Sequence, residues 1–342
     1  MKDIKSYTLT ELTDEVLALG EPKFRAKQLY EWMHKKKAAS LDDMLNIPKT
    51  LKDKIRAEYD YTALELELVQ ESKIDGTRKY LFKLEDGHYI ESVFMRYKHG
   101  NSVCISSQVG CRMGCRFCAS TLDGLIRGLK SSEMLEQIYA IERDTNERVS
   151  NIVVMGTGEP LDNFDALVRF IELISNQDGL NISQRNITVS TCGIVPKIYE
   201  LADLKLQITL ALSLHASSDE KRKELMPIAN KYSIAELMEA VTYYFNETGR
   251  RVSFEYSLVS GVNDTALDAT LLTKLLRDMH GHINLIPVNP IKERDYERST
   301  HEAVIAFKNK LEKNGLNVTI RRELGSDIDG ACGQLRHRVM KA

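Results

Sequence analysis

The sequence predicts an α/β protein built as an incomplete (β/α)6 barrel, preceded by a small N-terminal helical module and a β-hairpin. From Asn101 onward, short segments rich in Val, Ile and Leu alternate with segments whose apolar residues recur at helical spacing. This alternation indicates a parallel sheet covered by helices. About six such β/α units fit into residues 101–325, fewer than the eight of a complete barrel.

The first residues form a separate module in this prediction, at residues 1–75. Three segments carry apolar residues at helical spacing: residues 8–19, 24–36 and 47–59. In the second of them, one apolar face contains Phe24, Leu29, Trp32 and Met33. The third has Pro48 near its start, a position that suits the opening of a helix.

The pattern then changes from helical spacing to alternation. Residues 79–97 alternate between apolar and polar side chains on both sides of Glu85-Asp86-Gly87, which is a hairpin signal. We expect this linking hairpin to occupy residues 76–100.

The barrel is expected at residues 101–325, followed by a C-terminal tail at residues 326–342. Its strands are predicted at residues 103–107, 151–156, 186–193, 208–216, 251–261 and 282–290. Helices are predicted at residues 131–144, 163–174, 234–247, 266–279 and 301–315. Neither a low-complexity segment nor a sequence repeat interrupts this order.

Composition and charge narrow the class of protein. With 43% hydrophobic and 28% charged residues the chain resembles ordinary globular proteins. It lacks eighteen consecutive apolar residues, and the first residues lack the apolar core of a signal peptide. We therefore expect a cytoplasmic protein without a membrane span. In that reducing compartment, clustered cysteines indicate metal or redox chemistry rather than structural disulfides.

The net charge of −2 gives no global sign of nucleic-acid binding, but residues 21–56 hold ten Lys and Arg against five Asp and Glu. This surplus includes Lys35, Lys36 and Lys37, just after Trp32. A basic surface beside an aromatic ring can follow RNA phosphates. The alternative is an ordinary solvated helix face.

Four of the six cysteines lie within residues 104–118. Three of them, Cys111, Cys115 and Cys118, form a compact C-x3-C-x2-C run, whereas structural zinc sites usually use four ligands in two separated pairs. Three thiolates without an obvious fourth ligand are typical of a 4Fe–4S cluster that leaves one iron open. We interpret the run as an iron–sulfur site, with zinc or no metal as the alternative.

Residues suited to binding or catalysis follow the carboxyl ends of several predicted strands in turn. The carboxyl ends of parallel strands meet at one edge of such a sheet, where reactive groups gather. The cysteine loop follows the first strand. Later strand ends supply Glu159 and Pro160, Ser190, Ser213 to His215, and Asn289. We expect these residues to converge on one site.

The cysteine run after the first strand of a partial β/α barrel resembles the signature of the radical S-adenosylmethionine (SAM) superfamily. Six segments together resemble the RlmN family of adenine methyltransferases, whose relatives include Cfr: IESVFMRY, CISSQVGCRMGCRFCAS, MGTGEPLDN, ALSLHASSDEKRKELMPI, YSLVSGVND and GSDIDGACGQL. The resemblance covers most of residues 20–335. The chain departs from common family patterns at CAST, often CATG, and at Arg127-Gly128-Leu129, often Arg-Asn-Leu. Both departures lie beside the cysteine loop rather than at a reacting atom.

The resemblance implies a barrel of the radical SAM type, a 4Fe–4S cluster and two SAM molecules per turnover. It assigns the cluster to Cys111, Cys115 and Cys118. The residues that it implies as SAM contacts are Glu159, Pro160, Ser190, Ser213, Leu214, His215 and Asn289. Glu159 would face the amino group of SAM, for which a carboxylate is a suitable partner.

The resemblance also implies three catalytic residues. Cys332, in the tail, would accept a methyl group from one SAM. A 5′-deoxyadenosyl radical from a second SAM would take a hydrogen atom from that methyl group. The resulting carbon radical would add to carbon 2 of adenine and link protein to RNA. Glu91 would be the proton acceptor for the ring proton. The thiolate of Cys104 would attack the sulfur of Cys332, release the methylated RNA and leave a transient disulfide.

The implied substrates are 23S rRNA at the peptidyl-transferase centre and tRNA beside the anticodon. A protein electron donor such as flavodoxin or ferredoxin is implied as a further partner.

Three alternative functions stay open. A Cfr-like enzyme would methylate carbon 8 of the same adenine, and it is distinguished here by GEPL, where Cfr tends to have GEAL. Another radical enzyme, such as a glycyl-radical activase or a small-molecule synthase, would need no GACGQL-like tail. A non-enzymatic RNA-binding protein would hold zinc instead of a cluster.

Overall fold

A ten-stranded mixed sheet organises the chain, in the order β14-β13-β12-β11-β10-β9-β6-β5-β4-β3. The computed structural model describes residues 2–290, 293–328 and 334–341. Seven strands are parallel and neighbour one another in chain order: β6 (Asn101–Cys104), β9 (Val149–Val154), β10 (Ile187–Thr191), β11 (Thr209–Ser213), β12 (Val252–Leu258), β13 (Gly281–Pro287) and β14 (Val318–Ile320). Within the described residues β14 pairs with β13 alone, so the sheet stays open. The predicted incomplete barrel is confirmed, and β14 is a strand too short for its pattern to predict.

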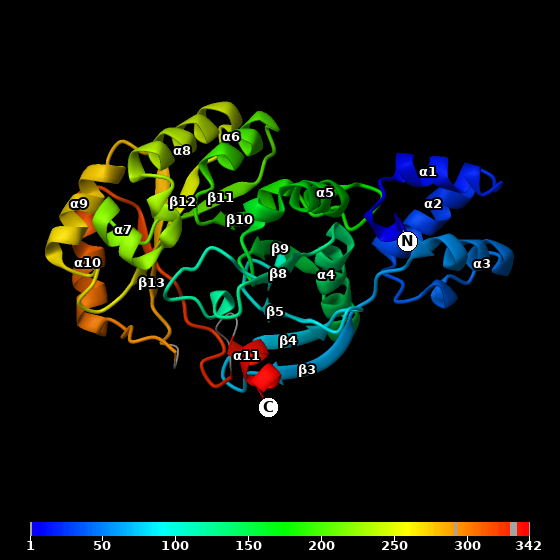
Figure 1. The fold of residues 1–342 in the computed structure, drawn as a ribbon, viewed down its shortest axis with the longest axis horizontal. Coiled ribbons are helices and arrows are strands. Elements are labelled where there is room, and N and C mark those ends of the chain that lie inside the picture. Colours follow the sequence, from blue (N-terminus) through cyan, green and yellow to red (C-terminus); the bar gives the residue numbers. More distant parts are fainter. Residues whose placement is uncertain (1, 291–292, 329–333, 342) are drawn as a thin grey trace.

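The helices that connect these strands form an arc around the outside of the sheet (Figure 1). They are α4 (Ser131–Thr145), α5 (Phe164–Ser175), α6 (Val195–Asp203), α7 (Asp219–Leu225), α8 (Ile234–Thr248), α9 (Ala266–Leu276) and α10 (His301–Lys313). Side-chain capping fixes the start of α8 at Ser233 and Glu236. The sequence pattern predicted all but α6 and α7, which are short. None of the described helices combines the length and apolar character that crossing a bilayer requires.

The N-terminal module packs three helices at one end of the molecule (Figure 1). Its elements are β1 (Lys2–Asp3), η1 (Ile4–Ser6), α1 (Leu9–Ala18), α2 (Phe24–Tyr30), η2 (Glu31–Lys35), η3 (Leu41–Asp43), α3 (Lys49–Glu58) and β2 (Tyr59–Asp60). Leu29 and Met33 are buried as predicted, and Trp32 is half-buried. The prediction was wrong for Phe24, whose side chain is 55% exposed. Phe24 lies in the first turn of α2, where the Arg25 guanidinium covers its ring at 4.8 Å instead of the core.

Three antiparallel strands extend the same sheet beyond β6. They are β3 (Glu65–Glu71), β4 (Arg78–Lys83) and β5 (Tyr89–Met95), and the last of them pairs with β6. The predicted turn between β4 and β5 closes through the N–H of Leu84, which donates to the carbonyl of His88 at 2.8 Å. The C-terminal helix α11 (Gln334–Lys341) contacts β5. A separate short pair is formed by β7 (Gln108–Gly110) and β8 (Leu125–Gly128).

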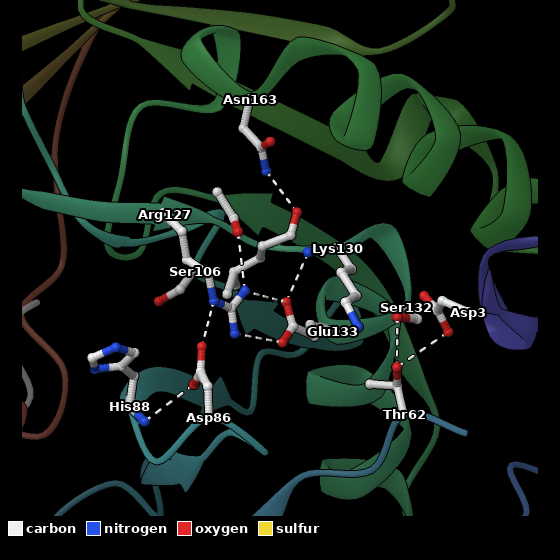
Figure 2. Close-up of polar contacts among 12 residues, drawn as sticks. Asp3, Thr62, Asp86, His88, Ser106, Arg127, Lys130, Ser132, Glu133 and Asn163 are labelled. Carbon is white, nitrogen blue, oxygen red and sulfur yellow. Dashed lines mark hydrogen bonds and ion pairs between the residues drawn. The ribbon is translucent and has the colours of Figure 1, made fainter. Parts of the chain in front are cut away.

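Polar contacts tie both the module and the hairpin to α4 (Figure 2). The hydroxyl of Ser132 on α4 donates to Oγ1 of Thr62 at 2.9 Å. Arg127 on β8 donates through Nε to Asp86 at 2.6 Å, and through Nη1 and Nη2 to Glu133 at 2.7 and 2.8 Å. Arg127 therefore fixes β8 between the hairpin turn and α4.

A buried ion pair joins the module to the barrel. Nζ of Lys5 lies 2.9 Å from Glu136 on α4, and neither side chain is exposed to solvent. Nζ also donates to the carbonyl of Thr62 at 2.6 Å, and Arg143 donates to the other oxygen of Glu136. Burial lowers the pKa of Lys5, and the charge of Glu136 opposes that change. The position of the module depends on this pair, because an unpaired charge at such a depth is costly.

Replacing Lys5 by Met should lower the free energy of unfolding by about 3 kcal/mol, because Glu136 then keeps only Arg143 as a charged partner. Denaturant titration followed by circular dichroism measures this loss. Lys2→Met is the matched control, because Lys2 pairs with Glu15 at 2.7 Å through a side chain that is 62% exposed. Exposed pairs contribute little to stability. Equal losses in the two variants would contradict the role given to the buried pair.

Candidate active site

The cysteine loop connects β7 to β8 and is anchored on both sides. Gly110 has a φ of 76°, and a Cβ there would lie 2.0 Å from the carbonyl oxygen of Gly124. Only glycine permits this approach. The N–H of Cys111 donates to the same carbonyl at 2.8 Å. Farther along the loop, the N–H of Arg116 donates to the carbonyl of Leu225, at the end of α7, at 2.9 Å.

Cys111, Cys115 and Cys118 line one cavity of about 240 Å³, which we call the cysteine cavity. Five of the expected SAM contacts line it as well: Glu159, Pro160, Ser190, Ser213 and His215. Among the described residues, no three His, Cys, Asp or Glu side chains are arranged to hold a single metal ion. Three thiols that line one cavity are a suitable ligand set for an iron–sulfur cluster.

The electrostatic environment of the thiols fits a metal cluster. Burial raises the pKa of Cys111 to about 12. Burial also raises the pKa of Cys115 well above its usual value, and the charge of Arg222 opposes this rise. Because thiolates are the form that binds metals, the positive charge of bound iron would favour the ionised form of both thiols.

Glu159 is a buried carboxylate with a fixed orientation at the end of β9. Gly158 has a φ of 113°, and a Cβ there would lie 2.6 Å from the side chain of Gln108. Oε1 of Glu159 accepts from the N–H of Leu161 at 3.0 Å, and Oε2 accepts from the N–H of Cys192 at 2.7 Å. Burial raises the pKa of Glu159, and these donors oppose the rise. The carboxylate is therefore held in a fixed orientation at the cavity, where a cationic ligand would favour its ionised form.

The ends of β10 and β11 supply hydroxyls and an imidazole. The oxygens of Ser190 and Ser213 lie 3.3 Å apart. Nδ1 of His215 accepts from the N–H of Ser257 at 2.9 Å, which leaves the ring proton on Nε2. Burial and the nearby charge of Arg222 lower the pKa of His215 to about 3. The imidazole is therefore a neutral N–H donor on the wall of the cysteine cavity.

Leu214 and Asn289 lie elsewhere than the other expected SAM contacts. The side chain of Leu214 is fully buried, and its N–H donates to the carbonyl of Glu255 at 3.1 Å. Asn289 lines a second cavity of about 420 Å³, which we call the tail cavity. The two cavities share Ile286 and Arg321, so they adjoin each other.

Sequence reasoning missed several residues that line the cysteine cavity: Cys192, Met226, Glu255, Ser257 and Arg321. Burial raises the pKa of Glu255, and the hydrogen bond from Asn284, at 2.8 Å, opposes the rise. The alternating polar residues Ser253, Glu255 and Ser257 in an otherwise apolar strand were a signal that could have identified this face of β12.

Cys104 lines the tail cavity rather than the cysteine cavity. It pairs with Val93 of β5, and both are buried. The same cavity is lined by Tyr97 and by three arginines, Arg298, Arg321 and Arg322. It is also lined by the chain that leads to residue 328: Leu324, Gly325, Ser326 and Ile328. The structure thus separates Cys104 from the three cysteines of the loop.

Glu91 is buried on β5 and forms an ion pair with the equally buried Lys79 at 2.8 Å. Its Oε1 also accepts the N–H of Arg336, near the start of α11, at 2.5 Å. Because side chains alternate along a strand, Glu91 shares its face of β5 with Val93 and Met95, which line the tail cavity.

Cys332 lies outside the described residues. The described chain before it is fixed by Asp327, which accepts from Ser72 Oγ at 2.6 Å and from the N–H of Lys73 at 2.8 Å. The described chain after it is fixed by the bond between Arg336 and Glu91. The ends of the described chain on either side of Cys332 therefore lie against the antiparallel strands that border the tail cavity.

Comparison with known proteins places this geometry in a family. Residues 105–273 match the family profile of the radical SAM superfamily, and residues 2–59 match the profile described as the ribosomal RNA large subunit methyltransferase N-terminal domain. The chain is similar to a crystal structure described as a radical SAM methyltransferase from Sphaerobacter thermophilus, with a TM-score of 0.94 and 40% identity. That similarity covers 98% of this chain and 99% of the other.

Two curated relatives are named "Probable dual-specificity RNA methyltransferase RlmN". The protein from Lachnospira eligens is 65% identical over all of this chain and 97% of its own. The protein from Lachnoclostridium phytofermentans is 61% identical over 98% of this chain and 94% of its own. The expected fold and the expected cofactors, a 4Fe–4S cluster and SAM, are confirmed. The chain belongs to the RlmN family of radical SAM RNA methyltransferases.

Proposed function

We propose that this protein methylates carbon 2 of adenosine in 23S rRNA, at the peptidyl-transferase centre, and in tRNA beside the anticodon, through a methylated Cys332. The observation that carries the proposal is the pair of adjoining cavities. One is lined by the three loop cysteines, and the other by Cys104 and the chain that leads toward Cys332. Such an arrangement gives a protein thiol access to both a cofactor and a substrate.

The cysteine cavity is assigned to the cofactors. Cys111, Cys115 and Cys118 would hold the cluster, and Glu159 would hold the amino group of SAM. Ser190, Ser213 and His215 would donate or accept further hydrogen bonds, and Pro160 would contact SAM from the same wall. Asn289 would contact SAM only where it reaches into the adjoining tail cavity, and Leu214 only through its backbone, because its side chain is fully buried. When bound, the cluster and SAM supply one-electron chemistry that converts a methyl group into a reactive carbon centre.

The tail cavity is assigned to the methyl transfer. Cys332 would receive a methyl group on sulfur and carry it to the adenine ring. Glu91 would take the ring proton. Its Oε2 lies 2.8 Å from Nζ of Lys79, and this ion pair fixes the position of the carboxylate. The thiolate of Cys104 would then attack the sulfur of Cys332 and break its bond to the carbon attached to the RNA. That carbon would take up a proton to become the methyl group, and the two sulfurs would form a disulfide that cellular reductants reopen.

The N-terminal module, at residues 1–75, is assigned to RNA binding. Nζ of Lys36 lies 4.0 Å from the centre of the Trp32 ring, which joins a cation to an aromatic surface. Contacts between such basic side chains and RNA phosphates would supply affinity, while RNA shape and an unstacked base would supply specificity. The hairpin at residues 76–100 and the barrel at residues 101–325 would present the site, and the tail at residues 326–342 would carry Cys332. In the cytoplasm, a donor such as flavodoxin or ferredoxin would supply the electrons.

Replacing Glu159 by Gln should weaken SAM binding at least tenfold, about 1.4 kcal/mol. The change removes the negative charge. It also places the amide NH2 group, which is a donor, opposite the backbone N–H of Leu161 or Cys192, so that one of these hydrogen bonds is lost. Equilibrium binding of SAM to the anaerobic, cluster-loaded protein measures this. Glu172→Gln is the matched control, since it removes a carboxylate that is 54% exposed on α5. Unchanged SAM affinity in the Glu159 variant would contradict its role.

Replacing Cys104 by Ala should leave the protein covalently linked to its RNA, because no thiolate remains to release it. Denaturing electrophoresis of labelled RNA measures the link. Cys104→Ala combined with Cys332→Ala is the control and should form no link. Release at the wild-type rate from the single variant would remove Cys104 from the mechanism.

Nucleoside analysis of RNA released by the wild-type protein tests the ring position, because 8-methyladenosine as the product would overturn the assignment to carbon 2.

A further inference from the structure

Arg222, on α7, is a fully buried cation that lacks one hydrogen-bond partner. Nε donates to the carbonyl of Leu214 at 3.2 Å, and Nη2 donates to the carbonyl of Cys192 at 2.6 Å. Nη1 has no hydrogen-bond partner in the part of the chain that the structure describes. Asp219 acts on the guanidinium electrostatically but does not bond to it.

The other fully buried cations in the described chain are paired. Lys5 lies 2.9 Å from Glu136, and Lys79 lies 2.8 Å from Glu91. The nearly buried Arg336 also leaves Nε and Nη2 without hydrogen bonds, but it has a carboxylate, that of Asp123, at 4.0 Å. Burying a charge without an opposite charge costs much free energy. The exception at Arg222 therefore suggests that its counter-ion is not a side chain of the described protein.

Arg222 lies directly behind the wall of the cysteine cavity. The carbonyls that it contacts belong to Cys192 and to residues 213–214, and the side chains of Cys192 and Ser213 line that cavity. Leu225, on the same helix, accepts the N–H of Arg116 between the second and third loop cysteines. The charge of Arg222 acts on Cys115 as well.

A 4Fe–4S cluster bound by three thiolates carries net negative charge, and reduction adds one more. We propose that Arg222 is the buried counter-charge of this cluster and raises its reduction potential, so that an electron can enter more readily. Cluster potentials respond to local charge and burial in this way. The inference rests on the assignment of the three loop cysteines as cluster ligands. Arg222 is a positioning residue, because it acts through the wall of the cavity.

The test is a redox titration of the full-length, cluster-loaded protein, followed by electron paramagnetic resonance in the absence of SAM and RNA. Arg222→Gln keeps donors for the carbonyls but removes the charge. At a fixed potential we expect its ratio of reduced to oxidised cluster to fall at least tenfold, which is about 59 mV for a one-electron couple. Arg222→Lys, which keeps the charge, should stay within about threefold of wild type.

The matched control is Lys223→Met, which removes an exposed charge from the same helix and should leave the ratio unchanged because water screens it. Iron and sulfide content confirms that each variant holds its cluster. If Arg222→Gln binds no cluster, Arg222→Met is titrated in its place. An unchanged ratio in a cluster-loaded neutral variant would overturn the proposal, as would an equal shift in Arg222→Lys. Since no RNA is present, this result is independent of the methylation reaction.

Discussion

The parallel register of the strands from β6 to β13 is the constraint on which the active site depends. Because successive strands are neighbours, their carboxyl ends meet at one edge of the sheet. Glu159, Ser190, Ser213 and Ser257 come from four different strands or their ends and line the same cavity. The cysteine loop reaches this cavity because β7 and β8 hold it and Arg127 fixes β8 to α4. Loss of this register would disperse every group assigned to the cofactors.

Buried charge determines how the other parts attach to this sheet. Lys5 and Glu136 fix the helical module, and Lys79 and Glu91 lie beside the C-terminal helix. Each of these pairs compensates its own charge. Arg222 does not do so within the described chain, and it lies behind the cavity assigned to an anionic cluster. Lys5 and Lys79 are thus paired within the protein, whereas the counter-charge that we propose for Arg222 is the bound cluster.

The sequence predicted the parts of the site that depend on local spacing. Glu159 follows an apolar strand of the parallel sheet, so its place at the site was predictable from the topology. The cysteine run was recognisable from its spacing, but the antiparallel pair of β7 and β8 that holds it was not predicted. Arg222 was not predictable, because α7 reads as a polar helix and only packing reveals that this one side chain is buried. The ion pair between Glu91 and Lys79 was missed because it joins two strands across a register that the pattern does not specify. The separation of Asn289 from the other expected SAM contacts likewise depends on how two cavities adjoin. Helical spacing put Phe24 on the same apolar face as Leu29 and Met33, but its position in the first turn of α2 leaves it exposed.

The central claim is that the methyl group reaches RNA through Cys332. Peptide mass spectrometry of the tail, after anaerobic purification and incubation with SAM, tests it most directly. If Cys332 carries the methyl group, we expect a single added methyl group on Cys332 and none on Cys104. An unmodified Cys332 in protein that holds its cluster and binds SAM would contradict the claim, while the assignment of the cysteine cavity would stand.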